Sequence, residues 1–126
     1  MYMINALVGE KIPAGEARKQ INLVVLECNV KGTDLARGLN MNDAQLNRMR
    51  HKKTGFYRAE TLRPIARVQA ILELAEKILT KVGVRKWLTT PNPRLDDLPP
   101  ILCLRTDKEA EKVKSLLVAL GHGFPA

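Results

Sequence analysis

The feature that most constrains the fold is a run of apolar residues at helical spacing in the middle of the chain. Between residues 60 and 82, one stripe recurs every three or four positions and a second stripe lies beside it. The first stripe consists of Ile65, Val68, Leu72, Ala75, Leu79 and Val82, and the second of Ile71, Leu74 and Ile78. The pattern predicts one long helix with an apolar face wider than a small domain covers. We expect this helix to contact both halves of the chain, and homodimerisation through it is a hypothesis.

Shorter helices are predicted on both sides of this segment. Apolar residues recur at intervals of three and four between residues 14 and 29, and Asn42 can cap a further short helix with Gln45 at its third position. The segment from Thr106 to Glu109 is a capping box, which predicts a last helix that Gly121 ends. The sequence therefore predicts an all-α fold, in which an N-terminal helix-turn-helix is joined by the long helix to a small helical C-terminal domain.

The charge balance indicates a polyanionic partner. The 126 residues carry 21 Lys and Arg against 13 Asp and Glu, a formal net charge of +8. The segment from Arg48 to Arg58 alone holds five basic residues and no acid. No apolar run approaches the roughly 20 residues of a membrane span. Cys28 and Cys103 lie far apart among apolar neighbours, so we expect reduced thiols and a cytoplasmic protein with no membrane partner.

Residues 33–48 fit a DNA-binding helix-turn-helix position by position. Ala36 is small where the two helices would cross, and Asn40 tolerates the left-handed backbone of the turn. Gln, Asn and Arg side chains read base edges, and basic residues beyond the helix meet phosphates. The predicted DNA-binding residues are Asp43, Ala44, Gln45, Asn47, Arg48, Arg50, Lys52 and Lys53. The alternative is a helical hairpin with a solvated polar face.

The C-terminal half carries a second set of motifs. They are Trp87-Leu88-Thr89-Thr90-Pro91-Asn92, Leu95, Pro100, Leu104-Arg105-Thr106, Val113 through Leu117, and Gly121-His122-Gly123-Phe124. In this order they resemble the toxin-binding domain of Xre/MbcA/ParS antitoxins, and with the upstream helix-turn-helix the resemblance spans roughly residues 20 to 126. The family commonly has a pair of glycines where this chain has Asp96-Asp97, and another near Glu109.

The resemblance implies an antitoxin that binds a RES-domain toxin, whose fold is related to ADP-ribosyltransferases and which attacks NAD. It also implies repression of the antitoxin's own operon through operator DNA. By analogy, the C-terminal tail would lie at the toxin's active-site cleft, with Phe124 as the anchor and His122 and the free carboxylate as polar contacts. The predicted toxin-binding residues are His122, Gly123, Phe124, Pro125 and Ala126. The alternative for Phe124 is that it folds back onto the last helix.

These expectations divide the chain into four parts. Residues 1–13 are a flexible arm, 14–58 the helix-turn-helix DNA-binding domain, and 59–83 the connecting and dimerisation helix. Residues 84–126 are the toxin-binding domain with its inhibitory tail. We expect a homodimer within a hetero-oligomeric complex that also contains the toxin.

No enzymatic site is predicted from the sequence. Catalysis needs a nucleophile with its base, a paired-carboxylate site or a metal cluster. The chain offers distant cysteines, distant histidines and one acidic pair, Asp96-Asp97, in a proline-rich loop. His51 lies in the basic run without ligand-spaced partners, so neither metal nor cofactor is expected. The runner-up function is a stand-alone helix-turn-helix regulator without a toxin, and a third is a purely structural dimer module.

Overall fold

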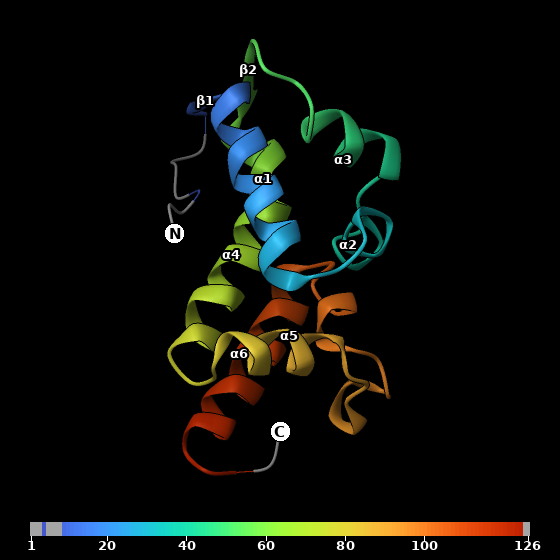
Figure 1. Cartoon of the computed structure of the whole chain (residues 1–126), viewed down its shortest axis with the longest axis vertical. Helices are drawn as coiled ribbons and strands as arrows, with labels where there is room; N and C mark the ends of the chain where they lie inside the picture. The colour runs from blue at the N-terminus through green and yellow to red at the C-terminus, as the bar shows by residue number, and fades with distance from the viewer. Residues whose placement is uncertain (1–3, 5–8, 125–126) are drawn as a thin grey trace.

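The computed structural model describes residue 4 and residues 9–124 of the chain (Figure 1). The helices are α1 (Ala14–Cys28), α2 (Gly32–Gly38), α3 (Asp43–Met49), α4 (Arg63–Glu76), α5 (Lys81–Thr89) and α6 (Asp107–Gly121). Three short 3-10 turns, η1 (Ala59–Leu62), η2 (Pro93–Leu95) and η3 (Pro100–Leu102), and two strands, β1 (Lys11–Pro13) and β2 (Phe56–Arg58), complete the elements. The predicted all-α class is confirmed, with a small two-stranded ribbon added.

Helix α1 forms where the sequence predicts it and lies alongside α4 (Figure 1). Ala17, Ile21 and Val24 face inward and are completely buried, as their spacing requires. The helix ends at Asn29, whose left-handed backbone (φ 54°) lets its N–H bond back to the last turn. The predicted first helix is therefore confirmed.

The expectation of one long helix over residues 60–82 is wrong. Helix α4 ends at Glu76, and α5 begins at Lys81 in a different direction (Figure 1). The Thr80 hydroxyl accepts a hydrogen bond from the Gly83 N–H at 3.1 Å and so caps a new helix. Because of this break, α5 packs against α1 and η3. The Val82 side chain, which belongs to the predicted stripe, is 73% exposed.

The expectation of a flexible arm over residues 1–13 is also wrong for the part that the structure describes. Ile4 is buried and its backbone N–H donates to Gln69 Oε1 at 2.8 Å. Residues 11–13 form β1, which pairs antiparallel with β2, because extended backbone next to an unpaired segment gains hydrogen bonds by pairing with it. Residues 1–3 and 5–8 lie outside the described part of the chain.

One continuous core runs through α1, α4 and α6 and reaches α2 and η3. The N-terminal helix pair is joined to the C-terminal half by backbone contact, since the Leu104 N–H donates to the Gly38 carbonyl at 3.2 Å. Within the described residues, no helix is both long and apolar enough to cross a bilayer. The N-terminal helices and the C-terminal half thus share a core.

Candidate functional site

Helices α2 and α3 have the geometry that the sequence predicts. Asn40 takes the left-handed conformation with φ 55°, and the Met41 N–H donates to the Ala36 carbonyl at 2.8 Å. Asn42 caps α3, its Oδ1 accepting from the Ala44 N–H at 2.8 Å and the Gln45 N–H at 3.3 Å. Because these bonds fix the turn, the two helices are held at a defined angle.

Most of the predicted DNA-binding side chains lie outward. Gln45 is half-buried, while the other members on α3 and the two lysines beyond it are exposed: Asp43, Ala44, Asn47, Arg48, Lys52 and Lys53. Leu46 and Met49 are buried beneath this face, as expected for the inner side of the helix. Asp43 and Asn47 line one pocket, Gln45, Arg48 and Lys52 line another, and Ala44 lies in both. Arg48, Lys52 and Lys53 are exposed cations of this part of the chain.

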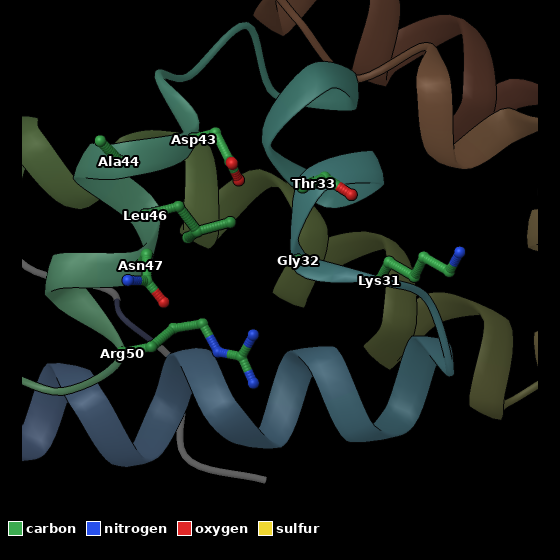
Figure 2. Close-up of a pocket in the computed structure, with 8 residues that line it drawn as sticks. All are labelled: Lys31, Gly32, Thr33, Asp43, Ala44, Leu46, Asn47 and Arg50. Atoms are coloured by element: carbon green, nitrogen blue, oxygen red, sulfur yellow. The ribbon is translucent and has the colours of Figure 1, made fainter.

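Arg50 is placed differently from the expectation. Its Nε donates to Asn22 Oδ1 at 2.9 Å, and Asn22 Nδ2 donates to the Arg50 carbonyl at 3.1 Å. Figure 2 shows the guanidinium pointing along α1 into a pocket between α1, α2 and α3. That pocket, of about 440 Å³, is lined by Lys31, Gly32, Thr33, Asp43, Ala44, Leu46, Asn47 and Arg50. Arg50 therefore ties α3 to α1, and its backbone carbonyl is satisfied in the same contact.

A second pocket lies between α3 and the ribbon formed by β1 and β2. It is lined by Asn42, Ala44, Gln45, Arg48, Met49, Lys52 and Tyr57. Lys52 Nζ lies 5.1 Å from the centroid of the Tyr57 ring, within range of a cation–π contact. Sequence reasoning missed Tyr57, because a three-residue strand has too short an alternation to be recognised. The only signal was its position within the basic run.

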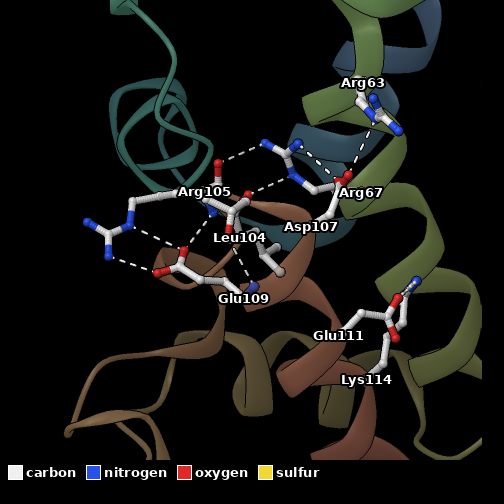
Figure 3. Close-up of polar contacts among 9 residues, drawn as sticks. Arg63, Arg67, Leu104, Arg105, Asp107, Glu109, Glu111 and Lys114 are labelled. Carbon is white, nitrogen blue, oxygen red and sulfur yellow. Dashed lines mark hydrogen bonds and ion pairs between the residues drawn. The ribbon is translucent and has the colours of Figure 1, made fainter. Parts of the chain in front are cut away.

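The C-terminal half is anchored on α4 by Arg67, which sequence reasoning also missed. Its Nε donates to the Leu104 carbonyl at 3.0 Å and its Nη2 to the Arg105 carbonyl at 3.2 Å, as Figure 3 shows. Its Nη1 lies 3.4 Å from Asp107 Oδ1, and Arg63 Nε lies 3.5 Å from the other oxygen of that carboxylate. One guanidinium thus satisfies two loop carbonyls at the start of α6.

The predicted capping box at the start of α6 forms only on its Thr106 side, because the Glu109 carboxylate reaches the backbone N–H of Arg105 instead of that of Thr106. The Thr106 hydroxyl accepts from the Glu109 N–H at 3.1 Å. The Glu109 carboxylate accepts from the Arg105 backbone N–H at 2.8 Å and from Arg105 Nη2 at 2.8 Å. The hydrogen bond from the Arg105 guanidinium lowers the pKa of Glu109 below its ordinary value, although partial burial acts in the opposite direction.

The loop between α5 and α6 has a compact turn built on Asn92. Its Oδ1 accepts from the Arg94 N–H at 2.9 Å, and its carbonyl accepts from the Asp97 N–H at 3.0 Å. Asp96 and Asp97 both have positive φ, 56° and 62°, the region that glycine adopts most easily. The chain thus keeps, with two aspartates, the backbone expected for the glycine pair common in the family that it resembles.

The tail after α6 carries an exposed aromatic side chain. The Phe124 N–H donates to the Ala119 carbonyl at 2.9 Å, and Gly123 has φ 85°. The Phe124 side chain is 63% exposed, so it does not fold back onto the last helix as the alternative required. His122 and Gly123 are exposed beside it. Pro125 and Ala126 of the predicted toxin-binding set lie outside the described residues.

The described residues contain no cluster of three or more His, Cys, Asp or Glu side chains that could hold a metal. Both cysteines are buried and unpaired by disulfide. Burial raises the pKa of the Cys28 thiol to about 12, with a smaller contribution from neighbouring Glu27. A thiol in that state is a poor nucleophile and a poor metal ligand.

Comparison with known proteins gives a match in the C-terminal half. Residues 75–123 match the family described as the antitoxin Xre/MbcA/ParS C-terminal toxin-binding domain. The match begins in the last turn of α4 and ends next to Phe124. The predicted resemblance to Xre/MbcA/ParS antitoxins is thereby confirmed for this part of the chain.

The fold of most of the chain is also similar to a solved structure. A chain from the crystal structure of the M. tuberculosis MbcT–MbcA toxin–antitoxin complex superposes with a TM-score of 0.62. The alignment covers 84% of this chain and 94% of that chain at 16% sequence identity, so it establishes a shared fold. The likeness therefore extends beyond the Xre/MbcA/ParS C-terminal domain into the N-terminal helices. A comparison with curated proteins found no match.

Proposed function

We propose that this chain is the antitoxin of a type II toxin–antitoxin system, and that it binds and neutralises a RES-domain toxin. The observation that carries the proposal is the Xre/MbcA/ParS toxin-binding domain match over residues 75–123. The shared fold with a chain of a toxin–antitoxin complex supports it. The toxin would attack NAD, either by degrading it or by transferring its ADP-ribose. The antitoxin itself would act by binding rather than by catalysis.

Neutralisation would occur by occlusion of the toxin's active site. The tail from residue 121 onward would enter the cleft, with Phe124 as its apolar anchor and His122 as a polar contact. Support comes from the 63% exposure of Phe124, because an aromatic side chain outside its own core is available to fill a partner's pocket. The hydrogen bond from the Phe124 N–H to Ala119 already orders the start of the tail, which reduces the entropy lost on binding.

The antitoxin would also repress its own operon by binding operator DNA as a homodimer. The exposed face of α3 supports this part of the proposal, because Gln45, Asn47 and Arg48 are of the types that read base edges. Asp43 and Ala44 lie on the same face, with Lys52 and Lys53 just beyond it to contact phosphates. Arg50 holds α3 on α1 through Asn22, and because its guanidinium also lines the open pocket beside Asn47 it stays in the proposed DNA-binding set.

Neutralisation is tested by growth of cells that express a candidate RES-domain toxin with and without this chain, and binding by affinity measurement on the purified pair. Phe124→Ala should weaken binding by about 2 kcal/mol or more, roughly 30-fold, as expected for a buried aromatic anchor. Leu26→Ala is the matched control, because Leu26 is a similarly exposed apolar residue (64%) on α1, outside the tail. Full neutralisation by a chain that lacks residues 122–126 would contradict occlusion.

A stand-alone helix-turn-helix regulator is the second candidate, and the exposed α3 face favours it independently of any toxin. The two candidates differ in one outcome. A chain that binds its own promoter region but neither binds nor neutralises a candidate RES-domain toxin is a regulator of this second kind.

A further inference from the structure

The ribbon of β1 and β2 presents two cations on its outward face. The register pairs Lys11 with Arg58, Ile12 with Tyr57, and Pro13 with Phe56. Ile12 and Tyr57 are half-buried and pack against the core. Because side chains alternate between the faces of a strand, Lys11 and Arg58 lie together on the opposite, exposed face.

Neither cation has a carboxylate in direct contact in the described part of the chain, although Arg58 is near enough to Glu60 to help lower the pKa of that carboxyl. Like charges directly opposite each other on paired strands repel and destabilise the pair. Among the residues described, neither Lys11 nor Arg58 forms an ion pair with a carboxylate. Such an arrangement is expected where an external anion offsets the repulsion.

The ribbon is continuous with the exposed face of α3. Tyr57 of β2 lines the same pocket as Gln45 and Arg48 of α3, and Lys52 Nζ lies over the Tyr57 ring. Figure 1 shows the ribbon at one end of the molecule, next to the segment that follows α3, whereas α6 lies toward the other end. The ribbon therefore lies beside the basic surface of Arg48, Lys52 and Lys53, with Tyr57 turned toward α3 and with Lys11 and Arg58 on the outward face.

We propose that the β1–β2 ribbon is a second DNA-contacting element, in which Lys11 and Arg58 bind the phosphate backbone of the duplex whose bases α3 reads. This inference rests on the DNA binding proposed above and assigns the partner as double-stranded DNA. A recognition helix of seven residues (α3) makes few base contacts, so contacts to the flanking backbone fix its register on the duplex. Phosphate contacts of this kind add affinity without sequence preference.

The test is the salt dependence of binding by the full-length chain, with two labelled duplexes of equal length as probes. One duplex comes from the chain's own promoter region and the other is unrelated in sequence. The double variant Lys11→Ala/Arg58→Ala should weaken binding to both duplexes by about tenfold. It should reduce the slope of log K against log[salt] by nearly 2, because each phosphate that the protein no longer neutralises lowers the slope by about 0.9. The preference for the promoter duplex should remain.

Lys108→Ala/Lys112→Ala is the charge-matched control, because both lysines are exposed and lie on α6, outside the ribbon and α3. It should leave affinity and salt slope unchanged. A ribbon variant that binds like the wild type, while Gln45→Ala/Arg48→Ala loses the promoter preference, would overturn the ribbon's role and leave DNA binding by α3 intact. A wild-type chain that binds neither duplex would overturn both.

Discussion

Gly38 in α2 and Ile101 in η3 approach each other so closely that no side chain fits between them. A Cβ atom on Gly38 would collide with the Ile101 carbonyl oxygen. The Leu104 N–H also donates to the Gly38 carbonyl at 3.2 Å. Backbone contact therefore joins the N-terminal helix pair to the C-terminal half, and the two proposed binding functions belong to a single packed body.

Gly38→Ala should destabilise the fold by about 2 kcal/mol or more, because the added methyl group meets a backbone atom that cannot move away locally. For a chain of this length the loss corresponds to a fall in Tm of roughly 6–8 °C. Thermal unfolding followed by circular dichroism measures it.

Gly32→Ala is the control for this prediction. Its Cβ would lie 2.9 Å from Arg50 Nη1, the end of a flexible side chain that can shift. We expect Gly32→Ala to change the free energy of unfolding by less than about 1 kcal/mol. Equal effects of the two substitutions would contradict the account of the Gly38 contact.

Arg67→Ala should lower the free energy of unfolding by about 2–3 kcal/mol, because it removes charged hydrogen bonds to the Leu104 and Arg105 carbonyls. The Arg67 side chain is only 13% exposed, so water screens these bonds little. Lysine at this position should recover only part of the loss, since it lacks the planar fork that reaches two carbonyls. Urea unfolding measures both variants.

The comparison for Arg67 is Arg63→Ala, which removes an ion pair with the same Asp107 carboxylate. The Arg63 and Asp107 side chains are 64% and 60% exposed, so Arg63→Ala should lower the free energy of unfolding by less than about 1 kcal/mol. If Arg63→Ala cost as much as Arg67→Ala, the ion pairs rather than the carbonyl contacts would anchor α6.

Glu109→Gln should lower stability at neutral pH by about 0.5–1 kcal/mol, because Arg105 is half-exposed and its pair with Glu109 is screened. The pKa of Glu109 is lowered in the folded state, so the carboxylate contributes stability above its unfolded pKa. That contribution is lost as pH falls below about 4.5 and through the folded value. Urea unfolding across this range should show the wild type and variant converging at acid pH.

Glu111→Gln serves as the matched control for the acid titration. Glu111 contacts Lys114 at 3.1 Å but is 71% exposed, so the substitution should change stability little at any pH. A gap between wild type and Glu109→Gln that persists at the lowest pH would show that the charge on Glu109 is not its cause.

Cys28 should resist alkylation in the native protein. With its pKa raised to about 12 by burial, only about one thiol in ten thousand is ionised at pH 8. Cys103 is 7% exposed and burial raises its pKa as well, so it should also react slowly. Mass spectrometry after iodoacetamide treatment, with and without urea, checks this. Native Cys28 that reacts as fast as unfolded Cys28 would contradict the packing described.

The elements that could be predicted from the sequence are those fixed by local hydrogen bonds. Asn42 and Thr106 cap their helices, and Asn40 turns the chain between α2 and α3, because each residue type satisfies neighbouring backbone groups by itself. The outward position of Arg48 follows from helical periodicity in the same way.

The features that could not be predicted depend on partners far along the chain. Strand β1 pairs with β2 across more than forty residues, and Arg67 donates to a carbonyl 37 positions away. The break at Thr80 was hidden because the apolar stripe continues through it to Val82. The contact between Arg50 and Asn22, 28 positions apart, likewise turns an expected phosphate ligand toward α1.

The most direct test of the central claim is co-expression of this chain with a candidate RES-domain toxin, followed by co-purification and measurement of NAD. The account predicts a stable complex and NAD levels that fall when the candidate toxin is expressed alone but are maintained when both are present. Failure to co-purify, together with equal loss of NAD in both cases, would contradict the antitoxin function.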